Sequence, residues 1–256
     1  MIDSGVGGIS VLAHVHYLLP DENIVYFADI ANAPYGEKRP EEIVALLHQI
    51  IKAYPEKDLK SIVLACNTAT SAAASILRSE LTIPVIGMEP ALKPAVMETD
   101  GRIIVMATRL TIREEKFRKL LEKYGQGKDI VPLSCPGLME LVEKDPSGPE
   151  VRDYLKEILA PYEDTAESVV LGCTHYVFLY PLIRTLYPKI RIFDGNEGVA
   201  RHLAHVLEEN QALGGNGEIE IRCSVQEPEE RDRYLQRCGE MYTLGQNIIH
   251  IKTDKV

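Results

Sequence analysis

"VLACNTATSAAASILRSELTIPVIG" (residues 63–87) recurs in outline as "VLGCTHYVFLYPLIRTLYPKIRIFD" (residues 170–194), and the two stretches align without a gap. In each, an apolar run ends at a cysteine, polar residues follow, a helix-like segment comes next, and a second apolar run closes the unit. The alignment pairs Cys66 with Cys173. Because strand, helix and strand in this order form a parallel pair with a crossover helix, the repeat predicts two related α/β halves.

The rest of the chain has the same alternation of short apolar runs and amphipathic segments. Strands are expected at 23–29, 61–66, 83–88, 102–108, 129–135, 168–173 and 190–194, and helices at 39–54 and 70–80 among others. This pattern is typical of an α/β fold with mainly parallel sheets. We expect two pseudosymmetric α/β domains with the active site in the cleft between them, at the carboxyl ends of the strands.

A stretch rich in Gly and Asn, residues 209–218, is the best candidate for a linker. The strand and helix that follow it are expected to return to the first half. The predicted domains are therefore residues 1–95 plus 208–256, and residues 96–207.

The first expected strand is unusually short. Only Met1 and Ile2 precede the turn "DSGVGG" (3–8), whereas a full apolar run precedes Thr108 at the matching place in the second half. We expect the first strand to be truncated and the protein less stable for it; a naturally short strand is the alternative.

Composition narrows the class of protein. The 256 residues carry a net charge of −10, which argues against a nucleic-acid or anionic-membrane surface. The sequence has no unbroken apolar run of membrane-spanning length and no signal-peptide pattern at its start. Five cysteines at irregular spacing fit a reducing cytoplasm better than a disulfide framework.

The two aligned cysteines are the candidate reactive groups. A thiol between a strand and a helix N-terminus lies near backbone N–H groups and the positive end of the helix dipole, which favours the thiolate. Polar residues follow each cysteine: Asn67 and Thr68 after the first, Thr174 and His175 after the second. Buried, inert cysteines are the alternative for either one alone, but two in equivalent positions favour function.

The motifs together resemble the glutamate racemase family, whose members are cofactor-independent racemases of acidic amino acids. The matching segments are "DSGVGG" (3–8), "APYG" (33–36), "ACNTA" (65–69), "ATRLT" (107–111) and "GCTHY" (172–176). They follow the family's order over most of the chain, and their combination is highly specific.

The resemblance implies roles for individual residues. Cys66 and Cys173 would be the two acid/base residues, with Asp3 supporting Cys66, and His175 and Glu143 supporting Cys173; Glu140 is a nearby alternative to Glu143. Residues that would hold the substrate are Ser4, Pro34, Tyr35, Gly36, Asn67, Thr68, Thr108, Thr111 and Thr174. The family carries a fuller first strand, and many members have Ser at the position of Gly195.

The implied activity is interconversion of L- and D-glutamate without cofactor or metal, which supplies D-glutamate for peptidoglycan in the cytoplasm, in an enzyme that could be a homodimer. Inversion at a carbon needs one group on each face, and a thiol titrates near neutral pH, as acid/base catalysis requires. Two alternatives stay open. One is a racemase or isomerase for aspartate or another acidic amino acid; the other is a non-catalytic homologue that senses a ligand or binds a protein.

Overall fold

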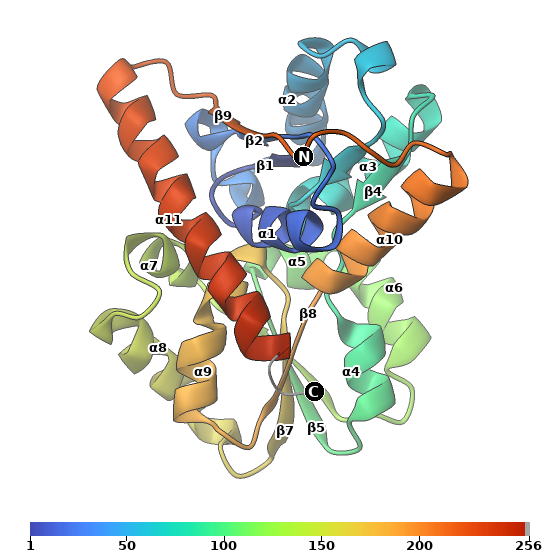
Figure 1. Ribbon diagram of the computed structural model, residues 1–256. Coiled ribbons are helices and arrows are strands. Elements are labelled where there is room, and N and C mark those ends of the chain that lie inside the picture. Colours follow the sequence, from blue (N-terminus) through green and yellow to red (C-terminus); the bar gives the residue numbers. More distant parts are fainter. Residues whose placement is uncertain (254–256) are drawn as a thin grey trace. The chain divides into compact units, whose positions relative to one another are not determined.

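The computed structural model describes residues 1–253 and divides into two compact units (Figure 1). The first unit contains Met1–Met88 and Asn196–Val256, and the second contains Glu89–Gly195. Each unit has its own sheet, and every strand pairing within the described residues is parallel. The α/β class predicted from the alternating pattern is confirmed.

The first unit is built on a five-stranded sheet in the order β4-β3-β1-β2-β9. Its strands are β1 (Ile2–Asp3), β2 (Ile24–Ala28), β3 (Ile62–Leu64), β4 (Val85–Gly87) and β9 (Ile219–Cys223). Its helices are α1 (Ile9–Leu18), α2 (Pro40–Lys52), α3 (Asn67–Glu80), α10 (Asn196–Glu209) and α11 (Pro228–Thr253), with short 3₁₀ turns η1 (Ile30–Asn32), η2 (Tyr35–Glu37) and η3 (Glu56–Asp58).

The second unit is built on a four-stranded sheet in the order β6-β5-β7-β8. Its strands are β5 (Arg102–Ala107), β6 (Ile130–Ser134), β7 (Ala166–Leu171) and β8 (Arg191–Asp194). Its helices are α4 (Leu92–Glu98), α5 (Arg109–Arg113), α6 (Glu115–Tyr124), α7 (Leu138–Lys144), α8 (Pro149–Leu159) and α9 (Tyr180–Leu186), with 3₁₀ turns η4 (Ala160–Tyr162) and η5 (Thr174–Leu179).

The two sheets have the same internal order. β4-β3-β1-β2 in the first corresponds strand for strand to β8-β7-β5-β6 in the second. The sequence repeat falls on this correspondence, because residues 63–87 run from β3 to β4 and residues 170–194 run from β7 to β8. Cys66 and Cys173 therefore occupy equivalent places, each just beyond the carboxyl end of a strand beside the central one.

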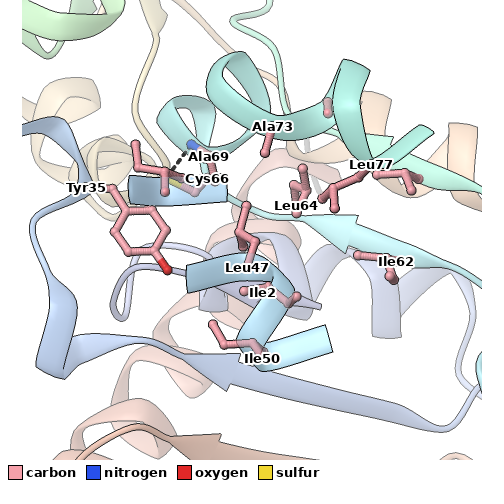
Figure 2. Close-up of a cluster of buried hydrophobic side chains, with 13 residues drawn as sticks. Ile2, Tyr35, Leu47, Ile50, Ile62, Leu64, Cys66, Ala69, Ala73 and Leu77 are labelled. Carbon is pink, nitrogen blue, oxygen red and sulfur yellow. Dashed lines mark hydrogen bonds between the residues drawn. The ribbon is translucent and has the colours of Figure 1, made fainter. Parts of the chain in front are cut away.

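Local sequence explains why these helices form where they do. In α2, Pro40 stands at the first turn, and the Glu42 carboxylate accepts the Arg39 backbone N–H at 3.0 Å, which closes the helix start. Ile43 and Leu47, four residues apart, are buried on its inner face. In α3, the buried Ala69, Ala73 and Leu77 repeat every fourth residue, and they belong to the core cluster that also contains Cys66 (Figure 2).

Helix α10 belongs to the first unit, whereas the boundary predicted from the sequence falls at residue 207, near the end of this helix, and places most of it in the second half. It packs along α1, on which α11 also packs, and the three helices lie together in the first unit (Figure 1). Buried Leu203 and Leu207 supply its inner face. Since the repeat ends at residue 194, the pattern contains no signal that assigns the next helix to either half.

The central strand β1 has only two residues. Ile2 and Asp3 pair with Phe27 and Ala28 of β2, and Ile2 also pairs with Leu64 of β3. The Met1 amino group donates to the Val25 carbonyl at 2.7 Å, and burial lowers its pKa to about 5. Two cavities, of about 400 Å³ and about 40 Å³, meet the start of this strand. Both are lined by Met1, Val25, Leu59 and Ser61.

Candidate functional site

Cys66 lies at the N-cap of α3. Its Sγ accepts a hydrogen bond from the Ala69 backbone N–H at 3.4 Å, and the residue is 8% exposed (Figure 2). Ser and Asp are common N-cap residues, and here the cysteine sulfur takes the place of their oxygen as the hydrogen-bond acceptor. The free N–H groups of the first helical turn and the helix dipole both favour negative charge on this atom.

The loop after β1 brings Asp3 and Ser4 to Cys66. The Ser4 hydroxyl lies 4.0 Å from Cys66 Sγ and 3.2 Å from Asp3 Oδ1, which also accepts the Gly5 backbone N–H at 2.9 Å. Asp3 is 1% exposed. A buried carboxylate is thus anchored by the loop's own donors, one serine away from the thiol.

A glycine and a tyrosine keep this loop in place. A Cβ at Gly8 would lie 2.5 Å from Asp3 Oδ2 and 2.8 Å from the Tyr26 hydroxyl, so only glycine fits there without displacing Asp3. The fully buried Tyr26 hydroxyl donates to the Gly5 carbonyl at 2.7 Å. The glycines of "DSGVGG" therefore include one, Gly8, that is required by its close approach to the Asp3 side chain.

The segment 33–36 contributes a residue to the buried cluster that contains Cys66. Tyr35 is 1% exposed and belongs to the core cluster of Cys66, and its hydroxyl donates to Asp29 Oδ2 at 2.7 Å (Figure 2). Burial and the bond to Asp29 raise the pKa of Tyr35 well above its usual value, so it stays a phenol. The peptide bond between Ala33 and Pro34 is cis, and the space beside Gly36 is open.

Asn67 and Thr68 open α3 and are both buried. The Asn67 side-chain oxygen is buried and has no hydrogen-bond partner. Such an atom is costly to leave unpaired, and a ligand donor such as an ammonium group would satisfy it.

In the second unit, Cys173 begins a chain of three polar side chains. Cys173 Sγ lies 3.8 Å from His175 Nδ1, and His175 Nε2 lies 2.8 Å from Glu143 Oε1. The His175 side chain is 3% exposed and that of Glu143 31% exposed. Glu143 comes from α7, while Glu140 on the same helix is exposed.

The partners of His175 favour its protonated form. Burial by itself would lower its pKa, but the bonds to Cys173 and Glu143 outweigh burial and raise the pKa well above the usual value. A cation between a thiol and a carboxylate stabilises the thiolate on one side and is held by the carboxylate on the other.

The sequence predicts an α-helix directly after Cys173. The structure instead has the 3₁₀ turn η5 there, beginning at Thr174, and α9 begins only at Tyr180. Pro181 lacks the N–H that an α-helix extending back through this turn would require. The dipole of a short 3₁₀ turn is weak, so the electrostatic support of Cys173 comes from His175 rather than from a helix.

The threonines predicted to bind substrate lie at two turns of the second unit. Thr108 caps α5, with its Oγ1 accepting the Thr111 N–H at 3.2 Å and lying 2.9 Å from the Thr111 hydroxyl. Thr108 follows β5 and the buried Thr174 follows β7, two strands that pair directly. Both turns therefore lie at the carboxyl edge of the sheet, beside Cys173.

A third cysteine, Cys135, lies in the same unit at the end of β6 and is 3% exposed. Burial, and then the proximity of Cys173, raise its pKa to about 12, so it keeps its proton. The Tyr176 hydroxyl donates to the Cys135 carbonyl at 3.1 Å and ties η5 to the segment that leads into α7.

The structure thus places the sequence-predicted residues in two groups, one in each unit. The first contains Asp3, Ser4, Tyr35, Cys66 and their neighbours; the second contains Thr108, Glu143, Cys173, Thr174 and His175. These groups also contact three residues that were not predicted from the sequence: Tyr26, Asp29 and Tyr176. Asp29 directly follows a strand at its carboxyl end, a signal that could have found it.

Within residues 1–253, no helix is long and apolar enough to cross a membrane, and no group of three or more His, Cys, Asp or Glu side chains could hold a metal ion.

The chain thus consists of two related parallel-sheet units, each of which presents a cysteine just beyond an equivalent strand. The sequence matches the Asp/Glu/Hydantoin racemase family over residues 9–203, and the chain belongs to that family.

Individual proteins and solved structures similar to this chain are glutamate racemases. The chain is 46% identical to the glutamate racemase of Clostridium perfringens (strain SM101 / Type A) over 88% of this chain and 90% of that protein. It resembles the crystal structure of Escherichia coli glutamate racemase in complex with L-glutamate and the activator UDP-MurNAc-ala, with a TM-score of 0.79 and 32% identity over 93% of each chain. It also resembles the Francisella tularensis enzyme in complex with D-glutamate, with a TM-score of 0.77 and 28% identity over 94% of this chain and 91% of that one.

Proposed function

We propose that this protein is a glutamate racemase, an isomerase that interconverts L- and D-glutamate by proton transfer at the α-carbon. The observation that carries the proposal is the equivalence of Cys66 and Cys173, one thiol just beyond the same strand of each sheet. The high identity to glutamate racemases over most of the chain supports glutamate as the substrate.

In the proposed mechanism, the two thiols act on opposite faces of the α-carbon. Cys173 as thiolate removes the proton of L-glutamate while Cys66 as thiol supplies a proton to the other face; D-glutamate reacts in the reverse sense. His175 and Glu143 stabilise the thiolate of Cys173. Asp3, through Ser4, and the N-terminus of α3 set the proton affinity of Cys66.

The remaining predicted residues hold the substrate. The Cα–H bond is a weak acid, so the carbanionic state needs fixed donors that are worth roughly 3–4 kcal/mol each. Ser4, Asn67, Thr68, Thr108, Thr111 and Thr174 supply hydroxyl and amide groups for the carboxylates and the amine. The unpaired Asn67 oxygen suits the substrate ammonium. Pro34, Tyr35 and Gly36 contribute the loop that adjoins Cys66.

The proposed activity needs neither cofactor nor metal, because the thiols perform both proton transfers. Its product would enter peptidoglycan synthesis in the cytoplasm, and a homodimer is the proposed assembly. Binding of nucleic acid is not expected at a net charge of −10.

The test is circular dichroism of L- and of D-glutamate during incubation with EDTA-treated, pyridoxal phosphate-free protein. Loss of optical activity from both enantiomers supports the proposal, and unchanged signals from folded protein refute it. Cys66→Ser and Cys173→Ser should each abolish racemisation, because a hydroxyl is a far poorer base near neutral pH. Wild-type rates in either variant would refute the two-thiol mechanism. Parallel assays with aspartate test the main alternative substrate.

A further inference from the structure

Asp29 is a buried acidic residue with no role in the mechanism above. It follows β2 directly, at the carboxyl edge of the first sheet, and is 2% exposed. A carboxylate is seldom buried this completely unless other groups satisfy it. Its partners therefore indicate what it does.

Three segments meet at Asp29. Its backbone N–H donates to the Asp3 carbonyl at 2.8 Å. Its Oδ2 accepts the Tyr35 hydroxyl at 2.7 Å, and its Oδ1 accepts the Asn32 side-chain amide at 2.9 Å. The residue thus joins the loop of Asp3 and Ser4 to the segment that carries Tyr35.

Tyr35 connects this carboxylate to the reactive cysteine. Its ring belongs to the buried cluster that contains Cys66, and Figure 2 shows the two side chains on neighbouring elements, with the hydroxyl at the far end of the ring from Cys66. A hydroxyl held at 2.7 Å by a carboxylate fixes both the position and the rotation of the ring. A Cβ at the next residue, Gly36, would meet no protein atom within 4 Å, so no other part of the chain covers this position.

We infer that Asp29 is a positioning residue for substrate binding: through the Tyr35 hydroxyl it holds the segment 34–36 against Cys66, an inference that rests on the proposed function. Asp29 itself touches neither substrate nor reacting atoms. Its loss therefore weakens glutamate binding more than it slows the chemical step.

The test is a double-mutant cycle with a matched control. Asp29→Ala and Tyr35→Phe each remove the same bond, and Asp29→Asn keeps an oxygen that can accept it. Glu22→Gln is the control, because Glu22 is another buried carboxylate (5% exposed) at the opposite end of β2, bonded to Lys60 and to the Gly214 backbone.

We expect Asp29→Ala and Tyr35→Phe each to raise KM for both enantiomers about tenfold, with less than a threefold fall in kcat, as loss of a charge-assisted hydrogen bond predicts. The KM of the double variant should be no higher than that of the single variant with the higher KM, since both substitutions remove the same bond. Asp29→Asn should recover most of the affinity, and Glu22→Gln should lower the melting temperature without changing KM. An unchanged KM in Tyr35→Phe, or effects that multiply in the double variant, would overturn the inference.

A second readout does not depend on activity. Iodoacetamide labelling of Cys66, followed by mass spectrometry, should be several-fold faster in Asp29→Ala and Tyr35→Phe than in Glu22→Gln, because the ring beside the thiol is released. If the wild type does not racemise glutamate, the proposed function fails and the labelling rates alone decide the role of Asp29. If the wild type is active, the KM values decide the role of Asp29. If Asp29→Ala does not fold, Tyr35→Phe, which removes the same bond, is used in its place.

Discussion

Replacing Glu143 by Gln tests whether the carboxylate of Glu143 raises the pKa of His175. The change keeps the shape of the side chain but removes the negative charge 2.8 Å from His175 Nε2. A hydrogen bond to a charged group contributes roughly 1.5–3 kcal/mol. Because Glu143 is 31% exposed, we take the lower part of that range, roughly 1.5–2 kcal/mol. If this energy stabilises the transition state, kcat/KM falls about 10- to 30-fold.

The pH dependence separates this effect from general damage. The bonds to Cys173 and Glu143 outweigh burial and raise the pKa of His175, so Glu143→Gln should lower that pKa and move the alkaline limb of the kcat/KM profile to lower pH. A raised folded-state pKa contributes stability that is fully present below the unfolded value, about 6.5, and is lost as pH rises through the folded value. The stability difference between wild type and Glu143→Gln should therefore be largest below about pH 6.5 and shrink in alkaline solution.

The assay is racemisation by circular dichroism from pH 6 to 10, with thermal melts at each pH. Glu140→Gln is the matched control, since Glu140 is an exposed carboxylate on the same helix. It should reproduce the wild-type profile. A Glu143→Gln enzyme with a wild-type rate and an unmoved alkaline limb would refute the argument that Glu143 holds the charge of His175.

Two further predictions concern the fold around the site. Gly8→Ala should cost roughly 1–3 kcal/mol of stability in thermal or urea unfolding, because its Cβ would meet Asp3 and Tyr26, whereas Gly198→Ala, in open space on α10, should cost nothing. Iodoacetamide at pH 8.5 should leave Cys135 unlabelled while it modifies Cys173, since the pKa of Cys135 is about 12; labelling at equal rates would contradict this.

The features that could be predicted from the sequence are those encoded locally. Apolar runs of strand length, a cysteine at the end of two of them, and the repeat of residues 63–87 at 170–194 sufficed for the α/β class and for the equivalence of Cys66 and Cys173. The resemblance added roles for residues that have no local pattern of their own, such as Ser4 and Thr108.

The features that could not be predicted depend on contacts between distant segments. Glu143 and His175 are 32 residues apart, and nothing local distinguishes Glu143 from Glu140; only the packing of α7 against η5 does so. The assignment of α10 to the first unit likewise depends on its contact with α1. The 3₁₀ turn after Cys173 was missed although Pro181 signals it, because the repeat suggested the same helix in both halves.

The unequal surroundings of the two thiols affect the enzyme between turnovers. Cys173 lies beside His175, whose pKa is raised, whereas Cys66 lies at a helix N-terminus and near a carboxylate reached through Ser4. Each conversion of L- to D-glutamate in the proposed mechanism leaves the proton on Cys173 and the negative charge on Cys66, so the emptied enzyme must exchange protons with water before it can accept another L-molecule. Because the two resting forms differ in energy, this recovery is faster in one direction. At high substrate concentration the enzyme should therefore convert the two enantiomers at different maximal rates, even though the equilibrium constant for the interconversion of L- and D-glutamate is one.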